Sequence, residues 1–98
     1  MTITKNLNGS TLTIALEGRL DTKTSPELEK EIRSSLDGVD ELIFDLSDLV
    51  YVSSAGLRVL LFAHKSMHGK GKMKIINANE IVMEVFGLTG FTNIFTIE

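Results

Sequence analysis

The chain has 98 residues, of which 43% are hydrophobic and 23% charged, and this composition suits one globular domain with a modest core rather than a disordered chain. Its net charge of −3 argues against a protein that binds the phosphate backbone of nucleic acids. Without cysteine, a bilayer-length apolar run or an apolar signal-peptide core, the sequence predicts a cytoplasmic protein with no membrane partner and no thiol chemistry.

The first 20 residues predict a β-hairpin. Ile3–Leu7 reads as a short strand, and Asn8–Gly9 is a typical hairpin turn. In the second strand, Thr11–Leu20, leucine and isoleucine alternate with more polar residues, as expected when one face of a strand is buried.

The first helix is predicted to begin near Thr24 and to stop at Asp37–Gly38. Thr24 and Glu27 fit a capping box, whereas Pro26 at the first helical position would make Ser25 the cap, and the sequence leaves both open. The apolar stripe of this helix is Leu28, Ile32 and Leu36.

A third strand is predicted over Glu41–Leu46. This run is nearly continuous in apolar residues, which suits a strand buried on both faces between helices. A loop, Ser47 to Ser54, is expected to follow it. The second helix then spans about Ser54–His68 and is mostly apolar, with Arg58 and Lys65 on its one wet face.

The rest of the chain predicts one more helix between two strands. Met73–Ile76 is a strand, and Asn77 or Asn79 then caps a helix that ends at Thr89–Gly90. Ile94–Ile97 is the last short strand. The third helix carries the apolar residues Val82, Val85, Phe86 and Leu88.

The predicted order is therefore β-β-α-β-α-β-α-β, an α/β fold with a mixed, mostly parallel sheet packed with helices. Because ligands and contacts on such sheets gather at the carboxyl ends of the strands, we expect the Arg19–Thr24 turn to meet the Ser47–Ser54 loop. Ser53 and Ser54 lie where that loop enters a helix, a position that favours anions. A serine there can be a helix cap, a nucleophile or a phosphate acceptor.

Three segments carry a family resemblance. Gly18–Asp21 with Thr24–Ser25, then Asp45–Leu57, and finally Val85–Phe95 resemble the STAS domain of bacterial anti-sigma-factor antagonists, in the same order along the chain. The resemblance implies the STAS fold as one domain over residues 1–98. Many family members continue into a fourth helix after the last strand, and that helix is expected to be absent from this sequence.

The resemblance also implies a switch. It identifies Ser54 as the phosphorylated serine, two residues before Gly56, and Ser53 stands where many members have Asp. The implied partners are an anti-sigma factor that is also a serine kinase and a PP2C-like phosphatase, acting on a monomer that needs no cofactor and no metal. The expected partner-binding residues are Arg19, Asp21, Thr22, Ser53, Ser54, Gly56, Leu57 and Arg58.

Several other readings remain open at this point. Ser53 and Ser54 are also good helix caps, and Asp21 can simply satisfy turn amides. A STAS subunit of a transport or stress-signalling assembly would share the fold without phosphorylation, and some members of the family are nucleotide-binding modules. A hydrolase is disfavoured, because Val52 stands where a nucleophile elbow needs glycine. We therefore expect a regulatory protein rather than an enzyme.

Overall fold

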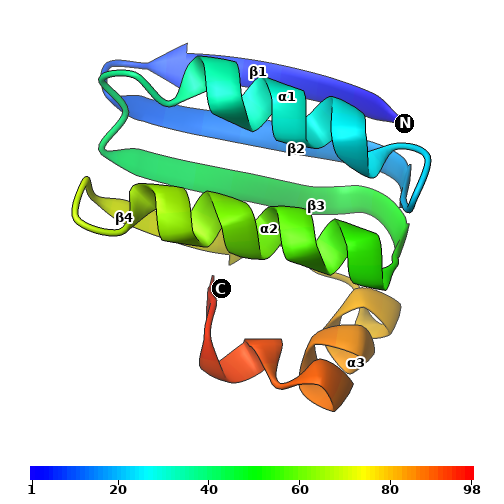
Figure 1. The fold of residues 1–98 in the computed structure, drawn as a ribbon. Helices are drawn as coiled ribbons and strands as arrows, with labels where there is room; N and C mark the ends of the chain where they lie inside the picture. Colours follow the sequence, from blue (N-terminus) through cyan, green and yellow to red (C-terminus); the bar gives the residue numbers. More distant parts are fainter.

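The computed structural model describes residues 1–98 and is built on a five-stranded sheet in the order β1-β2-β3-β4-β5 (Figure 1). β1 pairs antiparallel with β2, and every other neighbouring pair is parallel. The predicted element order and the mostly parallel, mixed sheet are confirmed. The strands are β1 (Thr2–Asn8), β2 (Thr11–Leu20), β3 (Glu41–Val52), β4 (Lys72–Ile76) and β5 (Thr96–Ile97).

Three α-helices and one short 3₁₀ helix connect these strands. α1 (Ser25–Ser35) and α2 (Ser54–Met67) run side by side across one face of the sheet (Figure 1). α3 (Glu80–Thr89) packs near the carboxyl half of β3 and is followed by η1 (Phe91–Asn93). None of these helices combines the length and the apolar character needed to cross a bilayer.

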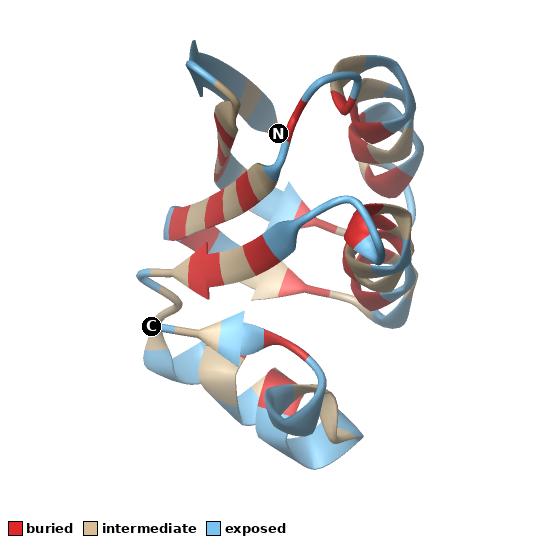
Figure 2. Cartoon of the chain, turned by 90° about the vertical axis from the view of Figure 1, so that its left-hand side faces the viewer, coloured by how far each residue is buried: buried red, intermediate tan, exposed pale blue.

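The core fills the space between this helical layer and the sheet. Along β3, Leu42, Phe44 and Leu46 are buried, whereas Ile43 between them is only partly buried. The same alternation of buried and partly exposed positions is visible across the sheet in Figure 2. The prediction that β3 is buried on both faces is therefore wrong. Successive right-handed crossovers from β2 to β3 to β4 place α1 and α2 on the same side and leave the other face open.

The predicted loop after Leu46 is also wrong over most of its length, because β3 continues to Val52. Two register shifts against β2 explain the error. Ala15 pairs with Asp45 but Glu17 pairs with Asp48, and the register slips by one residue again before Arg19. At each shift β3 contains one extra residue, as in a β-bulge. The bulges break the period-two pattern, so this stretch of strand reads as a loop in the sequence.

Aromatic rings hold the C-terminal segment against the core. The Phe95 ring stacks on Phe91 with centroids 5.2 Å apart and meets Phe86 edge-on at 5.7 Å. Asn79, not Asn77, caps α3 by accepting a hydrogen bond from the Val82 N–H at 2.9 Å. The last strand is shorter than predicted, because η1 occupies the chain just before it.

The apolar residues of α3 are buried to very different extents. Leu88 is 81% exposed, while Val82 and Phe86 are fully buried and Val85 is partly buried. The helix packs on the core through a narrower stripe than the sequence indicates, and Leu88 lies in its last turn, outside that stripe.

Truncation of Phe95 should therefore cost far more than truncation of Leu88. Phe95→Ala removes a buried ring from between two others and should lower the free energy of unfolding by about 3 kcal/mol. Leu88→Ala should change it by less than about 0.5 kcal/mol, because the side chain is exposed. Urea unfolding monitored by circular dichroism measures both. Equal losses from the two variants would contradict this packing of the C-terminal segment.

Candidate functional site

The N-terminus of α2 is seated directly on the end of β2. The Ser53 N–H donates to the Leu20 carbonyl oxygen at 2.9 Å, outside the regular sheet ladder. Gly56 makes the close approach possible, because a Cβ at this position would lie 2.7 Å from Leu20 Cγ and 2.8 Å from the Leu20 carbonyl oxygen. The expected meeting of the segment after β2 with the segment entering α2 is thus confirmed, with the backbone of Leu20 and Ser53 as the junction.

The two serines at this junction have different environments. Ser53 is the N-cap of α2, and its Oγ accepts a hydrogen bond from the Gly56 N–H at 3.3 Å. Ser54 is the first helical residue; its side chain is exposed and its hydroxyl has no hydrogen-bond partner within the protein. Of the two cap assignments that the sequence leaves open, the structure selects Ser53. The Ser54 hydroxyl is therefore free for chemistry.

The turn after β2 is closed by Asp21 and Thr24. Asp21 Oδ1 accepts hydrogen bonds from the Lys23 N–H at 3.0 Å and the Thr24 N–H at 3.2 Å. The Thr24 hydroxyl donates to the Arg19 carbonyl at 2.8 Å and accepts from the Asp21 N–H at 2.9 Å. The hydrogen bond from the Thr24 N–H is the largest reason why the pKa of Asp21 lies below its usual 3.8. Asp21 thus satisfies turn amides, which is one of the two roles that the sequence allows for it.

These bonds also explain why neither predicted cap of α1 forms. Thr24 occupies the N-cap position, but its hydroxyl is engaged in the turn and makes no capping bond. The Ser25 hydroxyl donates to the Asp21 carbonyl, so it too faces the turn rather than the helix. Both side chains therefore tie α1 to the end of β2.

Arg19 is held by two neighbours. Its guanidinium carbon lies 4.3 Å from the centre of the Tyr51 ring, and its Nε lies 3.8 Å from Asp21 Oδ2. Tyr51 and Thr24 lie within the two segments that the sequence predicts to meet, but neither is among the individually predicted partner-binding residues. Tyr51 meets Arg19 because the two residues pair across parallel strands. The bulges in β3 hide this register in the sequence.

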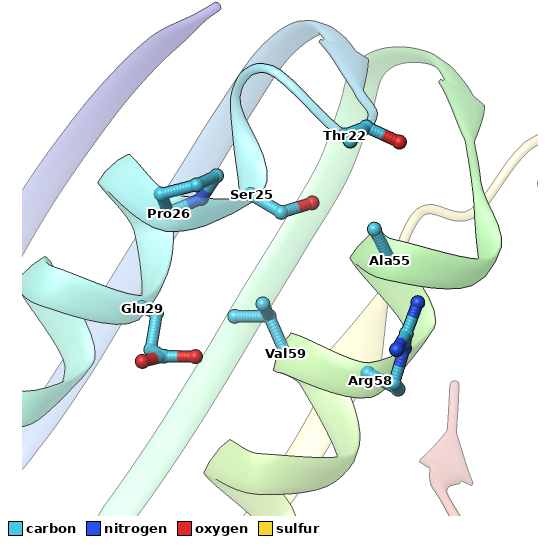
Figure 3. Close-up of a pocket in the computed structure, with 7 residues that line it drawn as sticks. All are labelled: Thr22, Ser25, Pro26, Glu29, Ala55, Arg58 and Val59. Carbon is cyan, nitrogen blue, oxygen red and sulfur yellow. The ribbon is translucent and has the colours of Figure 1, made fainter.

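A groove of about 380 Å³ separates the N-terminal parts of α1 and α2 (Figure 3). Figure 3 shows Glu29 extending from α1 toward the groove and Arg58 on the α2 side, with Val59 between the helices. Glu29 pairs with Arg33 on its own helix at 3.2 Å, whereas Arg58 is exposed and forms no ion pair. The lining residues are Thr22, Ser25, Pro26, Glu29, Ala55, Arg58 and Val59.

The expected partner-binding residues divide into an outer and an inner group. Arg19, Thr22, Ser54 and Arg58 are exposed, and Asp21 and Ser53 are partly buried. Gly56 and Leu57 are buried, with Leu57 only 4% exposed. These two shape the site from within: Gly56 has no side chain, and the Leu57 side chain does not reach the surface.

Comparison with known proteins gives one family. The family model described as the STAS domain matches residues 2–98. BtrV of Bordetella bronchiseptica, which carries the name of an anti-sigma factor antagonist, is 32% identical over 99 residues, covering 99% of this chain and 85% of BtrV.

Two solved structures show the same fold. An anti-sigma factor antagonist from Mycobacterium paratuberculosis superposes with a TM-score of 0.89 at 22% identity, covering 98% of this chain and 83% of that one. The Bacillus cell fate determinant SpoIIAA in its phosphorylated form gives a TM-score of 0.77 at 18% identity, covering 99% and 91%.

Alanine substitution should separate the two serines. Ser53→Ala removes the cap of α2 and should lower the free energy of unfolding by about 1 kcal/mol. Ser54→Ala removes an exposed hydroxyl that has no partner and should change it by less than about 0.5 kcal/mol. Urea unfolding of the two variants under identical conditions measures the difference. A larger loss of stability from Ser54→Ala than from Ser53→Ala would contradict the assignment of Ser53 as the cap.

The charge of Asp21 should appear in the pH dependence of stability. A carboxyl whose pKa is lowered by folding adds stability above its unfolded-state pKa of about 3.9, and this gain is lost as the pH falls through the lowered value. Asp21→Asn should therefore be less stable than the parent protein near neutral pH, and the gap should narrow in acid. Urea unfolding across this pH range tests the prediction. A gap that stays constant with pH would mean that the charge plays no part.

Proposed function

The chain belongs to the STAS domain family, and we propose that it is a non-enzymatic anti-sigma factor antagonist whose binding is switched off by phosphorylation of Ser54. In the unmodified state it binds an anti-sigma factor and so frees a sigma factor. The observation that carries the proposal is the state of Ser54, which is exposed at the start of α2 with its hydroxyl unengaged.

The anti-sigma factor is proposed to be a serine kinase as well. It transfers the γ-phosphoryl group of ATP to Ser54 Oγ, so that the hydroxyl proton leaves and ADP is formed. A PP2C-like phosphatase then hydrolyses the phosphoserine, returning the hydroxyl and releasing inorganic phosphate. The relative BtrV, named for antagonism of an anti-sigma factor, supports this choice of partner.

The proposed docking face combines the exposed side chains around Ser54. It consists of the turn residues Arg19, Asp21 and Thr22 together with Ser53, Ser54 and Arg58. Asp21 uses one carboxylate oxygen within the turn, and its other oxygen lies 3.8 Å from Arg19. The face is therefore polar and carries both signs of charge, as the rim of a reversible interface does.

A phosphate on Ser54 would change this face strongly and the fold little. It adds about −1.5 to −2 charge and three acceptor oxygens. A partner that fits the unmodified face would then have to desolvate that charge and would meet like-charge repulsion, and both effects weaken docking. The fold tolerates the same group, because the N-terminus of a helix favours negative charge and Ser53 keeps the cap.

Peptide mapping of the protein purified from its host, with and without phosphatase treatment, tests the modification. We expect one phosphate, on Ser54, that phosphatase removes. The unmodified protein should recover an anti-sigma factor from host extract, and a variant with phosphoserine installed at position 54 should not. Ser34→Ala is the matched control, since it removes an exposed hydroxyl of α1 outside the docking face and should still be phosphorylated at Ser54.

Two results would overturn the proposal. One is a protein free of phosphate at Ser54 in every growth condition, and the other is equal partner recovery by Ser54→Ala and phosphoserine-54 proteins. Either result would favour a STAS subunit of a transport or stress-signalling assembly.

A further inference from the structure

Arg58 is an unpaired cation beside the candidate phosphoacceptor. It is exposed and takes part in none of the ion pairs of the structure. The other arginine at this end, Arg19, is already held by Tyr51 and Asp21. Glu29, the acid across the groove, is paired with Arg33 at 3.2 Å. Arg58 is thus available for an anion that the unmodified protein does not contain.

Helix geometry places that anion next to Arg58. Ser54 and Arg58 are four residues apart in α2, so their side chains are neighbours on the same helix surface. Side chains on a helix also slope toward its N-terminus, so Arg58 covers the turn that begins at Ser54. Figure 3 agrees, because the guanidinium of Arg58 is directed along α2 toward the end that carries Ala55.

We propose that Arg58 is the internal counter-ion of a phosphate on Ser54. The inference rests on the proposed phosphorylation and adds its mechanism of regulation. The planar guanidinium can donate two parallel N–H bonds to two phosphate oxygens, a geometry that lysine cannot reproduce. The other charged groups of this end are Lys23 and Asp21 in the turn, Arg19 at the end of β2, and Glu27 and Glu29 on α1.

This pairing makes the modification act twice on the docking face. The phosphate adds negative charge, and the same event withdraws the Arg58 guanidinium from any acidic group that a partner would offer it. A partner selected for the unmodified face therefore loses an attraction and gains a repulsion in one step. Because the pair forms within one helix, it needs no movement of the sheet or of α1.

The test uses the full chain with phosphoserine installed at position 54 during translation, so that no kinase is required. Phosphorus NMR then follows the second ionisation of the phosphate in the parent protein and in Arg58→Gln. A guanidinium that pairs with the dianion lowers this pKa, so the Arg58→Gln protein should titrate about 0.4 unit higher. Arg58→Lys should recover part of the shift, because it keeps the charge and loses the forked geometry.

Lys23→Gln is the matched control, since it removes a cation of the adjacent turn without touching α2, and it should leave the titration within about 0.1 unit of the parent. A second readout is the Arg58 Nε–H signal, which should show a coupling to phosphorus across the hydrogen bond only in the phosphorylated protein. Equal titration of the parent and Arg58→Gln proteins, or an equal shift from Lys23→Gln, would overturn the inference.

The two proposals fail in different ways. A host protein without phosphate at Ser54 contradicts the proposed function, whereas the installed phosphoserine still reports whether Arg58 pairs with it. Phosphate present in the host protein together with an unchanged titration in Arg58→Gln contradicts only the pairing.

Discussion

The candidate site depends on one close backbone contact, in which the start of α2 rests on the end of β2. The Ser53 N–H binds the Leu20 carbonyl at 2.9 Å, and Gly56 lies so near Leu20 that any Cβ would overlap it. This contact fixes where the helix begins relative to the turn after β2. Both groups of exposed side chains, those of the turn and those of the helix, are placed by it. The buried residues Gly56 and Leu57 therefore affect the site only by fixing where α2 begins.

The turn on the other side of this contact is held by its own side chains. Asp21 accepts two backbone N–H bonds, and Thr24 bridges the Arg19 carbonyl and the Asp21 N–H. A face that is already ordered loses little conformational entropy when a partner binds. Arg19, stacked on Tyr51, extends this order to a long side chain that would otherwise be free. Because the face is ordered before binding, a partner can bind it reversibly without a large apolar patch.

The sequence predicts the element order and the start of α2 at Ser54, because periodicity and capping residues are local signals. It predicts the meeting of the two segments because the element order implies parallel strands whose carboxyl ends share one edge of the sheet. It fails where the structure depends on pairing between strands. The bulges in β3 hide the period-two pattern of Ser47–Val52, so this part of the strand reads as a loop, and only the bulged register brings Tyr51 to Arg19. Sequence also cannot rank Ser53 above Ser54 as the cap, because both residue types cap equally well and the choice depends on where the helix is anchored.

The two adjacent serines have different structural roles, and this difference decides which of them could carry a modification without loss of stability. Ser53 contributes to the fold through its bond to the Gly56 N–H, whereas Ser54 contributes no internal hydrogen bond. A group added to Ser53 would compete with the cap, so its effect on binding could not be separated from its effect on stability. A group added to Ser54 leaves the cap, the seat of α2 on Leu20 and the turn intact. Charge at that one position, such as the proposed phosphate, would therefore alter the surface while leaving the fold in place.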